Sequence, residues 1–363
     1  MTFTEALSAV RPKATDEGDR SALARATIVV LAAVLVMAFF FSLASGASDA
    51  SAWRVFLETL GFTSGALEGA DRIVVYGIRF PRAVLGMLIG AALAVSGAVM
   101  QGLFRNPLAD PGIVGVTAGG SLGAVSFIVL GSTLLAPVAA IFGIYAVPVG
   151  AFLGSLGVTL VLYRVATRRG QTSVATMLLA GIALTALAFA FTGLLIFRAD
   201  DQQLRDLTFW NLGSLAGATW TKNLMAAPFI LPALAISLLI SRQLNALALG
   251  EATARHLGID VQRIKIVAVV CVASATGAAV AVSGGIGFVG IVVPHLLRLL
   301  IGPDHRFLLP ASALLGAILL LFADAIARQI VAPAELPIGI VTAIAGAPFF
   351  LWILLRRRGI LDL

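Results

Sequence analysis

Long apolar segments, almost free of charge, dominate this sequence. Only 12% of its 363 residues are charged and 60% are hydrophobic, whereas soluble domains carry about 25% charged residues. A bilayer core about 30 Å thick is crossed by about 20 apolar residues of helix. Lipid allows only helices or closed barrels, because backbone groups must be hydrogen-bonded internally, and barrel strands are short and alternating. The sequence therefore predicts an all-α, polytopic membrane protein.

Ten hydrophobic segments are expected to span the membrane. They lie at about 26–45, 83–103, 113–131, 137–163, 174–197, 223–241, 264–283, 286–301, 308–330 and 337–355. The third and eighth are short, so a straight, full crossing is not expected of them. Residues 1–25 are expected to form a polar tail, and residues 26–358 one transmembrane domain. Most Lys and Arg residues fall on the side that holds both termini, which predicts that both termini are cytoplasmic.

Two glycine pairs have the spacing that lets membrane helices approach closely. Gly86 and Gly90 form one small-xxx-small pair, and Gly150 and Gly154 form the other. Such pairs also recur by chance in a chain with 37 glycines. A tight helix contact at either site is therefore one of two interpretations.

The chemistry of an autonomous pump or enzyme is not evident in the sequence. A phosphate-binding loop needs Lys followed by Ser or Thr, but Lys13, Lys222 and Lys265 precede Ala, Asn and Ile. Ion-coupled carriers place ionisable groups within the membrane, and here Asp324 and Arg328 are the main exception. Their i,i+4 spacing favours a local ion pair. We therefore expect neither ATP binding, nor catalysis, nor a metal site in this chain.

Three polar stretches interrupt the apolar pattern. The first comprises residues 79–82 and, after an apolar run, 101–112, where prolines are expected to end a helix. The second, 244–260, is too short and polar to span and predicts one or two small cytoplasmic helices. Its balanced charge favours a protein partner over a lipid anchor. The third, 283–298, begins with glycines that are expected to break a helix.

These stretches resemble the permeases that import iron–siderophore complexes, haem and cobalamin, which are type II importers powered by a separate ATPase. The resemblance runs from about residue 79 to residue 358. Its motifs are RFPR at 79–82, SGAVMQ at 96–101, RNPLADP at 105–111, LGEATARHLG at 249–258, GFVGIVVPHLLR at 287–298 and ELPIGIVT at 335–342. Several motifs in one order are far more specific than any one of them.

The resemblance implies a homodimer of ten-helix subunits in a bacterial inner membrane. Two ATPase subunits would bind on the cytoplasmic side and one periplasmic binding protein on the other, with no cofactor and no nucleic acid bound by this chain. The resemblance also implies three functional sites in this chain. The residues of these sites are Arg79, Arg82 and Arg328 for binding-protein docking; Gly250, Glu251, Ala252, Ala254, Arg255, His256 and Gly258 for a helix that couples to the ATPase; and Asn106, Leu108, Ser173 and Val174 for a cytoplasmic gate.

The stretch 207–220 is similar to the corresponding stretch of haem permeases. Arg198 and Arg205 precede it and could attract haem propionates at the external entrance, although Asp200, Asp201 and Asp206 could instead pair with these arginines. Haem is the first substrate hypothesis. Ferric siderophores and cobalamin remain alternatives within the family, and an ion-coupled secondary transporter is the alternative outside it.

Overall fold

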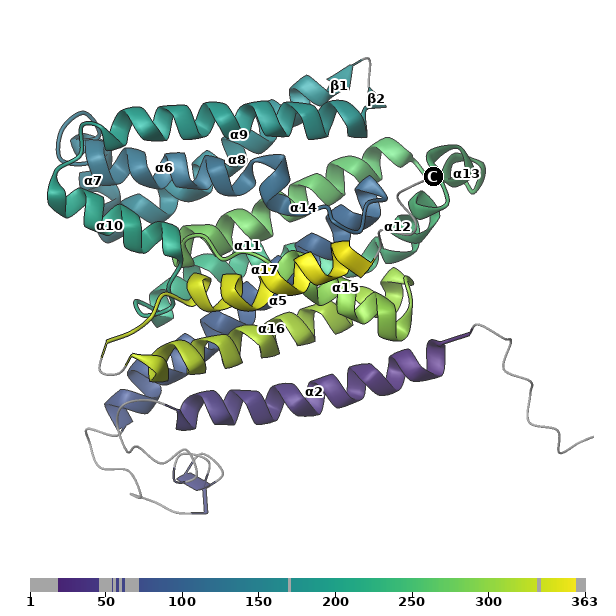
Figure 1. The fold of residues 1–363 in the computed structure, drawn as a ribbon, viewed down its shortest axis with the longest axis horizontal. Coiled ribbons are helices and arrows are strands. Elements are labelled where there is room, and N and C mark those ends of the chain that lie inside the picture. Colours follow the sequence, from purple (N-terminus) through teal and green to yellow (C-terminus); the bar gives the residue numbers. More distant parts are fainter. Residues whose placement is uncertain are drawn as a thin grey trace, which may run out of the picture.

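The computed structural model describes residues 19–45, 54, 57–58, 61–62, 72–168, 171–331 and 334–356. These residues are almost entirely helical, and one two-residue hairpin joins β1 (Thr167–Arg168) to β2 (Gln171–Thr172). The long helices run roughly along one direction, so their connections gather at two opposite ends (Figure 1). The expected all-α class is confirmed.

Ten apolar helices in the described residues correspond to the ten expected spans. Seven are long and apolar enough to cross a membrane when short preceding turns are included. They are α2 (Ser21–Ala44), α5 (Phe80–Phe104) with η1 (Ile73–Arg79), α8 (Ala146–Ala166) with α7 (Ala136–Phe142) and η3 (Gly143–Tyr145), α9 (Val174–Ile196), α11 (Trp220–Leu239), α14 (Val261–Ser283) and α16 (His305–Ile330). The others are α6 (Val116–Leu130), α15 (Val289–Ile301) and α17 (Ile338–Arg356). The two segments expected to be short are α6 and α15.

Several boundaries differ from the expected ones. The first helix already begins at Ser21, inside the segment assigned to the tail. The second was expected to start after residue 82, but η1 and α5 form one continuous helix from Ile73. A wide π-type turn precedes Pro81, with the Phe80 N–H bonding the Val75 carbonyl five residues back. Because this turn continues the helix into the proline, the RFPR motif lies within the helix rather than before it.

Short helices fill the connections between the apolar ones. The expected span at 137–163 is divided, because Gly143 adopts a positive φ of 52° between α7 and η3. The polar stretch at 244–260 forms two small helices, α12 (Ser241–Ala248) and α13 (Glu251–His256), in agreement with the expectation of one or two. Two further short helices were not expected: η2 (Pro111–Val114) and α10 (Asp201–Leu212).

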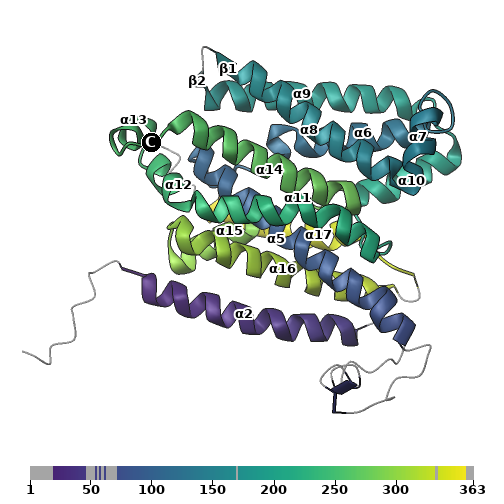
Figure 2. The same cartoon turned by 180° about the vertical axis from the view of Figure 1, so that it is seen from behind.

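Helices α5 and α14 form the centre of the protein. Helix α5 packs against α16, α14, α15 and α11, and Figure 2 shows α11 and α14 crossing over it. The contact with α16 is very close, because a Cβ built on Gly90 would lie 2.2 Å from the Gly316 carbonyl oxygen. In the α6–α8 contact, Gly150 and Gly154 meet Gly123 and Gly119. Both sequence pairs therefore contain a glycine at a tight helix contact.

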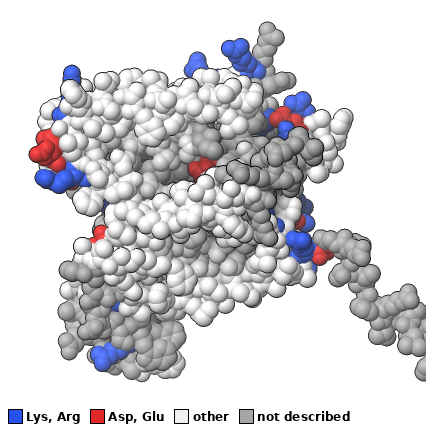
Figure 3. All heavy atoms as spheres, viewed as in Figure 1, with Lys and Arg blue, Asp and Glu red and all other residues white. Residues whose placement is uncertain are grey.

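The outer surface is suited to lipid over its middle. On the face in Figure 3, charged side chains gather at the two ends and leave a largely uncharged belt between them. Large apolar side chains are exposed on the outer helices, including Met37 on α2, Leu160 on α8 and Leu179 on α9. The chain is thus a multi-pass membrane protein, and its loop-bearing ends contain the candidate sites.

Candidate functional site

A buried ion cluster lies at the end of the protein where η1 begins and α16 ends. Arg82 on α5 donates to both carboxylate oxygens of Asp324 on α16, at 2.8–3.1 Å. Its Nη1 also donates to both oxygens of Glu335, at 2.8 and 2.9 Å. Such fork-shaped contacts are the strongest geometry for an arginine and a carboxylate. The cluster therefore ties α5, α16 and the segment before α17 together.

Two further arginines hold the end of α2 against this cluster. Arg79 donates to the Leu43 carbonyl at 2.8 Å, and Arg328 donates to the Ser45 carbonyl at 2.7 Å. Arg328 also pairs with Asp324 at 3.1 Å, which confirms the expected local ion pair. The unpaired carbonyls at a helix C-terminus carry partial negative charge. They complement the cationic excess of three arginines over two carboxylates.

All three arginines expected to dock a binding protein are buried in this chain. Arg79, Arg82 and Arg328 are 4%, 5% and 8% exposed. The accessible member of the cluster is Glu335, whose side chain is 40% exposed. A docking role for the arginines stays a prediction, and in this conformation a carboxylate from outside would reach Arg82 by replacing Glu335.

The two arginines of the expected substrate entrance lie at the start of α10: Arg205 is on the helix and Arg198 is in the turn before it. Asp200 begins this helix with a capping box shared with Gln203. Arg205 donates to Gln202 at 2.9 Å, and the same glutamine donates to Asp206. Among the described residues, no salt bridge joins Arg198 or Arg205 to the neighbouring aspartates. Both arginines are exposed. Asp200 serves as the helix cap and Asp206 bonds Gln202, so these two aspartates have other partners than the arginines.

The segment around α13, expected to be cytoplasmic, combines an anchored side with an exposed side. Positive φ angles of 114° at Gly250 and 79° at Gly258 allow the chain to turn sharply before and after the helix. Ala254 is fully buried, whereas Leu249 and Leu257 are 69% and 63% exposed. Ala252, Arg255 and His256 are also exposed. An exposed apolar pair beside polar groups is typical of a docking surface.

Helix α12 fixes this segment to the start of α16. Asn245 donates to Asp304 at 2.6 Å and accepts from the His305 backbone N–H at 2.8 Å. Leu244 and Leu247 are buried against the protein. The exposed helix α13 therefore extends from a well-anchored base.

The residues expected at a cytoplasmic gate lie in two structured turns. The Asn106 side chain accepts from the Leu108 N–H at 2.9 Å and shapes the turn after α5. Ser173 is the N-cap of α9 and accepts from the Thr176 N–H. The η2 segment after the first turn packs against α9, which brings the two regions near one another. The side chain of Val174 lies outside the described residues.

Lys265 is a functional candidate that the sequence interpretation missed. It lies in the first turns of α14, and its ammonium group is 2.7 Å from a carboxylate oxygen of Glu251 on α13. Its side chain is only 3% exposed. A lysine within a largely apolar stretch that follows a polar loop was the available signal, but the sequence could not identify its partner.

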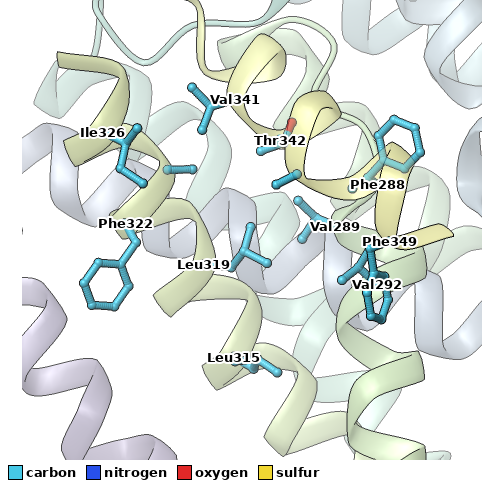
Figure 4. Close-up of a pocket in the computed structure, with 13 residues that line it drawn as sticks. Phe288, Val289, Val292, Leu315, Leu319, Phe322, Ile326, Val341, Thr342 and Phe349 are labelled. Carbon is cyan, nitrogen blue, oxygen red and sulfur yellow. The ribbon is translucent and has the colours of Figure 1, made fainter. Parts of the chain in front are cut away.

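An apolar groove of about 450 Å³ lies between α15, α16 and α17 (Figure 4). Phe288 and Val292 line one side, and Leu319, Phe322 and Ile326 on α16 line another. The one polar lining side chain, Thr342, donates to the backbone of its own helix. The groove is therefore suited to hydrocarbon, since its described lining presents no charged side chain to a polar ligand.

Comparison with known proteins places these features in context. The model of the FecCD transport family matches residues 34–356. The hemin transport system permease protein HmuU of Yersinia pestis is 47% identical over 316 residues, 87% of this chain and 92% of the relative. The vitamin B12 import system permease protein BtuC of Salmonella paratyphi A is 44% identical, covering 80% of this chain and 86% of the relative.

A solved structure agrees with the fold. A metal-chelate type ABC transporter in an inward-facing conformation superposes with a TM-score of 0.78 and 32% sequence identity. The match covers 91% of this chain and 98% of the other. The agreement therefore includes nearly all of the helices and both loop-bearing ends.

Proposed function

Because the chain belongs to the FecCD transport family and is a permease subunit of an ATP-binding-cassette transporter, we propose that it carries haem across the inner membrane into the cytoplasm. A permease subunit of this type is not itself catalytic, and a separate ATPase subunit binds ATP. Transport with an ATPase and a binding protein follows from this class.

One observation carries the choice of haem: the 47% identity to a hemin permease over most of both chains. Two exposed arginines support it, Arg198 before α10 and Arg205 on it, because propionate groups are anionic and, in the described part of the chain, no salt bridge joins either arginine to the neighbouring aspartates. Cationic groups at an entrance raise the local concentration of an anionic ligand.

Two other cargoes of the family compete with haem. The 44% identity to a vitamin B12 permease is close to that of the hemin relative, so cobalamin is the second candidate. A ferric siderophore is the third, in keeping with the metal-chelate transporter of the same fold. An ion-coupled carrier is disfavoured, because the buried charges Arg82, Asp324 and Arg328 are held by one another and by backbone carbonyls.

We further propose that α13 docks on the ATPase. The exposed Leu249 and Leu257 supply apolar area, and Arg255 and His256 beside them supply hydrogen-bonding groups. The docking set is the one expected from the sequence, namely Gly250, Glu251, Ala252, Ala254, Arg255, His256 and Gly258. In it, Ala254 and the two end glycines shape the helix while the exposed members make contact.

The binding protein is proposed to dock over the buried ion cluster at the opposite end. Its acidic groups would compete with Glu335 for Arg82, while Arg79 and Arg328 hold α2 in place beneath. Charge complementarity of this kind gives orientation and a fast association rate.

The working assembly is proposed to contain two copies of this chain, two ATPase subunits and one periplasmic binding protein. The face with α17 in front supports a second copy, because it is hollowed (Figure 3) and exposes Ile344, Leu351 and Leu355. The turns at Asn106, Leu108, Ser173 and Val174 would close the pathway on the cytoplasmic side. The start of α2 and the end of α17 lie at the same end as α13 (Figure 1), which supports two cytoplasmic termini.

Reconstitution in liposomes with the ATPase and the binding protein tests the proposed cargo. ATP-dependent uptake of haem, a ferric siderophore and cobalamin would be measured in parallel, with an ATPase variant unable to hydrolyse ATP as the control. We expect haem to accumulate. Uptake of cobalamin or siderophore alone would disprove the haem assignment and leave the importer intact, and no uptake of any cargo would contradict the importer.

A further inference from the structure

The lysine near the start of α14 joins two segments to which separate roles have been proposed. Lys265 lies in the cytoplasmic half of the protein, and its side chain is almost completely buried. Nζ is 2.7 Å from Glu251 Oε1 and donates to the Thr172 carbonyl at 2.8 Å. A buried ammonium group needs such partners, because desolvation otherwise makes its charge very costly.

The Thr172 contact leads directly to the N-terminus of α9. Thr172 is in β2, and the next residue, Ser173, is the N-cap of α9. The Ser173 N–H bonds the Ala166 carbonyl at 3.0 Å and closes the hairpin onto the end of α8. A displacement of Thr172 therefore acts on the start of α9 without a flexible linker between them.

A second residue of α14 holds the same threonine. Gln262, one helical turn before Lys265, accepts from the Thr172 N–H at 3.2 Å and from its hydroxyl at 3.1 Å. The hydroxyl also bonds the Thr167 hydroxyl across the hairpin at 2.9 Å. The start of α14 thus holds Thr172 by its N–H, carbonyl and hydroxyl groups.

Lysine is suited to this position in a way that arginine is not. Its ammonium group has three donors on a flexible stem and can serve a carboxylate and a carbonyl in different directions. Arginine presents its donors in one rigid plane, so it suits partners that lie in that plane, as Asp324 and Glu335 do for Arg82. The chain contains 3 lysines, and this is the one that connects two segments in the described structure.

We propose that Lys265 is a positioning residue that couples movement of α13 to the N-terminus of α9. The proposal rests on the proposed docking of the ATPase at α13. A shift of α13 moves Glu251, the ion pair transmits the shift to Lys265, and the charge-assisted bond transmits it to Thr172 and Ser173. Loss of the lysine leaves α13 free to bind the ATPase while α9 no longer follows it.

The test uses the complete transporter in liposomes and measures ATPase association, ATP hydrolysis and uptake separately. For Lys265→Met we expect unchanged association with the ATPase and continued hydrolysis. Uptake per ATP hydrolysed should fall by about tenfold, within the range typical of coupling between two sites. Arg263→Met is the matched control, because Arg263 is 83% exposed on the same helix and its ion pair with Asp260 lies at the surface.

A second variant and a distance measurement guard against a simple folding defect. Gln262→Ala removes two bonds to Thr172 and keeps the Glu251–Lys265 ion pair. It should lower uptake per ATP hydrolysed, but by less than Lys265→Met does. Spin labels at positions 255 and 176, in a Cys271→Ser background, should give a narrow distance distribution with Lys265 and a broader one with methionine.

Each outcome separates this proposal from the docking proposal. If Lys265→Met and Gln262→Ala both keep the wild-type ratio of uptake to hydrolysis, the coupling role is overturned. If Lys265→Met abolishes association with the ATPase, the lysine only shapes the docking surface and the coupling role is also overturned. If the unaltered chain does not bind the ATPase through α13, the docking proposal fails first.

Discussion

Arg82 on α5 and Asp324 on α16 form a buried ion pair in which the arginine bonds both carboxylate oxygens, although the two residues are 242 positions apart. The two side chains are only 6% and 2% exposed. Their pairing fixes the end of α5 that carries RFPR against the end of α16. Arg328 and Glu335 extend the cluster to α2 and to the segment before α17.

Removing the central carboxylate is expected to destabilise this end strongly. Asp324→Asn keeps the side-chain size but leaves Arg82 and Arg328 buried without their shared counter-charge. Breaking a buried ion pair costs about 3–5 kcal/mol. Thermal unfolding in detergent should show a clear loss of stability, whereas the exposed carboxylate change Asp201→Asn should show almost none. Equal stability of the two variants would contradict a structural role for the cluster.

The glycine contact between α5 and α16 should not tolerate a methyl group. A Cβ at Gly90 would lie 2.2 Å from the Gly316 carbonyl oxygen, so Gly90→Ala should force the helices apart. Overpacking of this kind costs about 1–3 kcal/mol, measured as a lower unfolding temperature. Gly157→Ala on α8 is the control, because nothing lies within 4 Å of its added Cβ and stability should be kept.

Glu335 is expected to compete with the binding protein. Glu335→Gln removes the exposed carboxylate that occupies the outer side of Arg82. Affinity for the binding protein, measured on nanodisc-embedded permease, should rise by up to about fivefold, because exposed ion pairs are worth about 0–1 kcal/mol. Glu335→Asp keeps the charge and serves as the control. A lower affinity for the glutamine variant would indicate that Glu335 itself contacts the partner.

An exposed leucine after α13 should contribute to ATPase association. Leu257 is 63% exposed, so Leu257→Glu should leave folding intact while it weakens co-purification of the ATPase about tenfold or more, as for a central interface residue. Leu204→Glu, at the opposite end of the protein on α10, is the matched control. Full association of the Leu257 variant would place the docking surface elsewhere.

Charge at the external entrance should matter for anionic cargo and less for neutral cargo. The double variant Arg198→Gln with Arg205→Gln should raise the KM for haem at low salt, and the difference should shrink at about 1 M salt, where charges are screened within about 3 Å. Arg164 is an exposed arginine in the last turn of α8, away from α10. Arg164→Gln therefore controls for the loss of a surface arginine. A KM for haem that does not change would remove these arginines from the entrance.

The sequence predicted the ten apolar helices well, because a span needs only length and apolar composition, and both are local properties. It also predicted one or two small helices before α14, of which the structure has two, and the helix break at the start of residues 283–298. It missed α10, since the polar capping box of Asp200 and Gln203 gives a weak signal beside strongly apolar spans. It also placed RFPR outside the helix, because a proline normally marks a helix start and the π-type turn before it could not be anticipated.

The sequence by itself determined the membrane class, the ten apolar helices and the family, because apolar length and ordered motifs depend on residue identity along the chain. The tertiary structure decided what the charged residues do. Arg82 is far in sequence from Asp324 and Glu335, and Thr172 is far from Lys265. An ion pair forms only where helix packing brings opposite charges within a few ångströms, and burial then makes its loss costly.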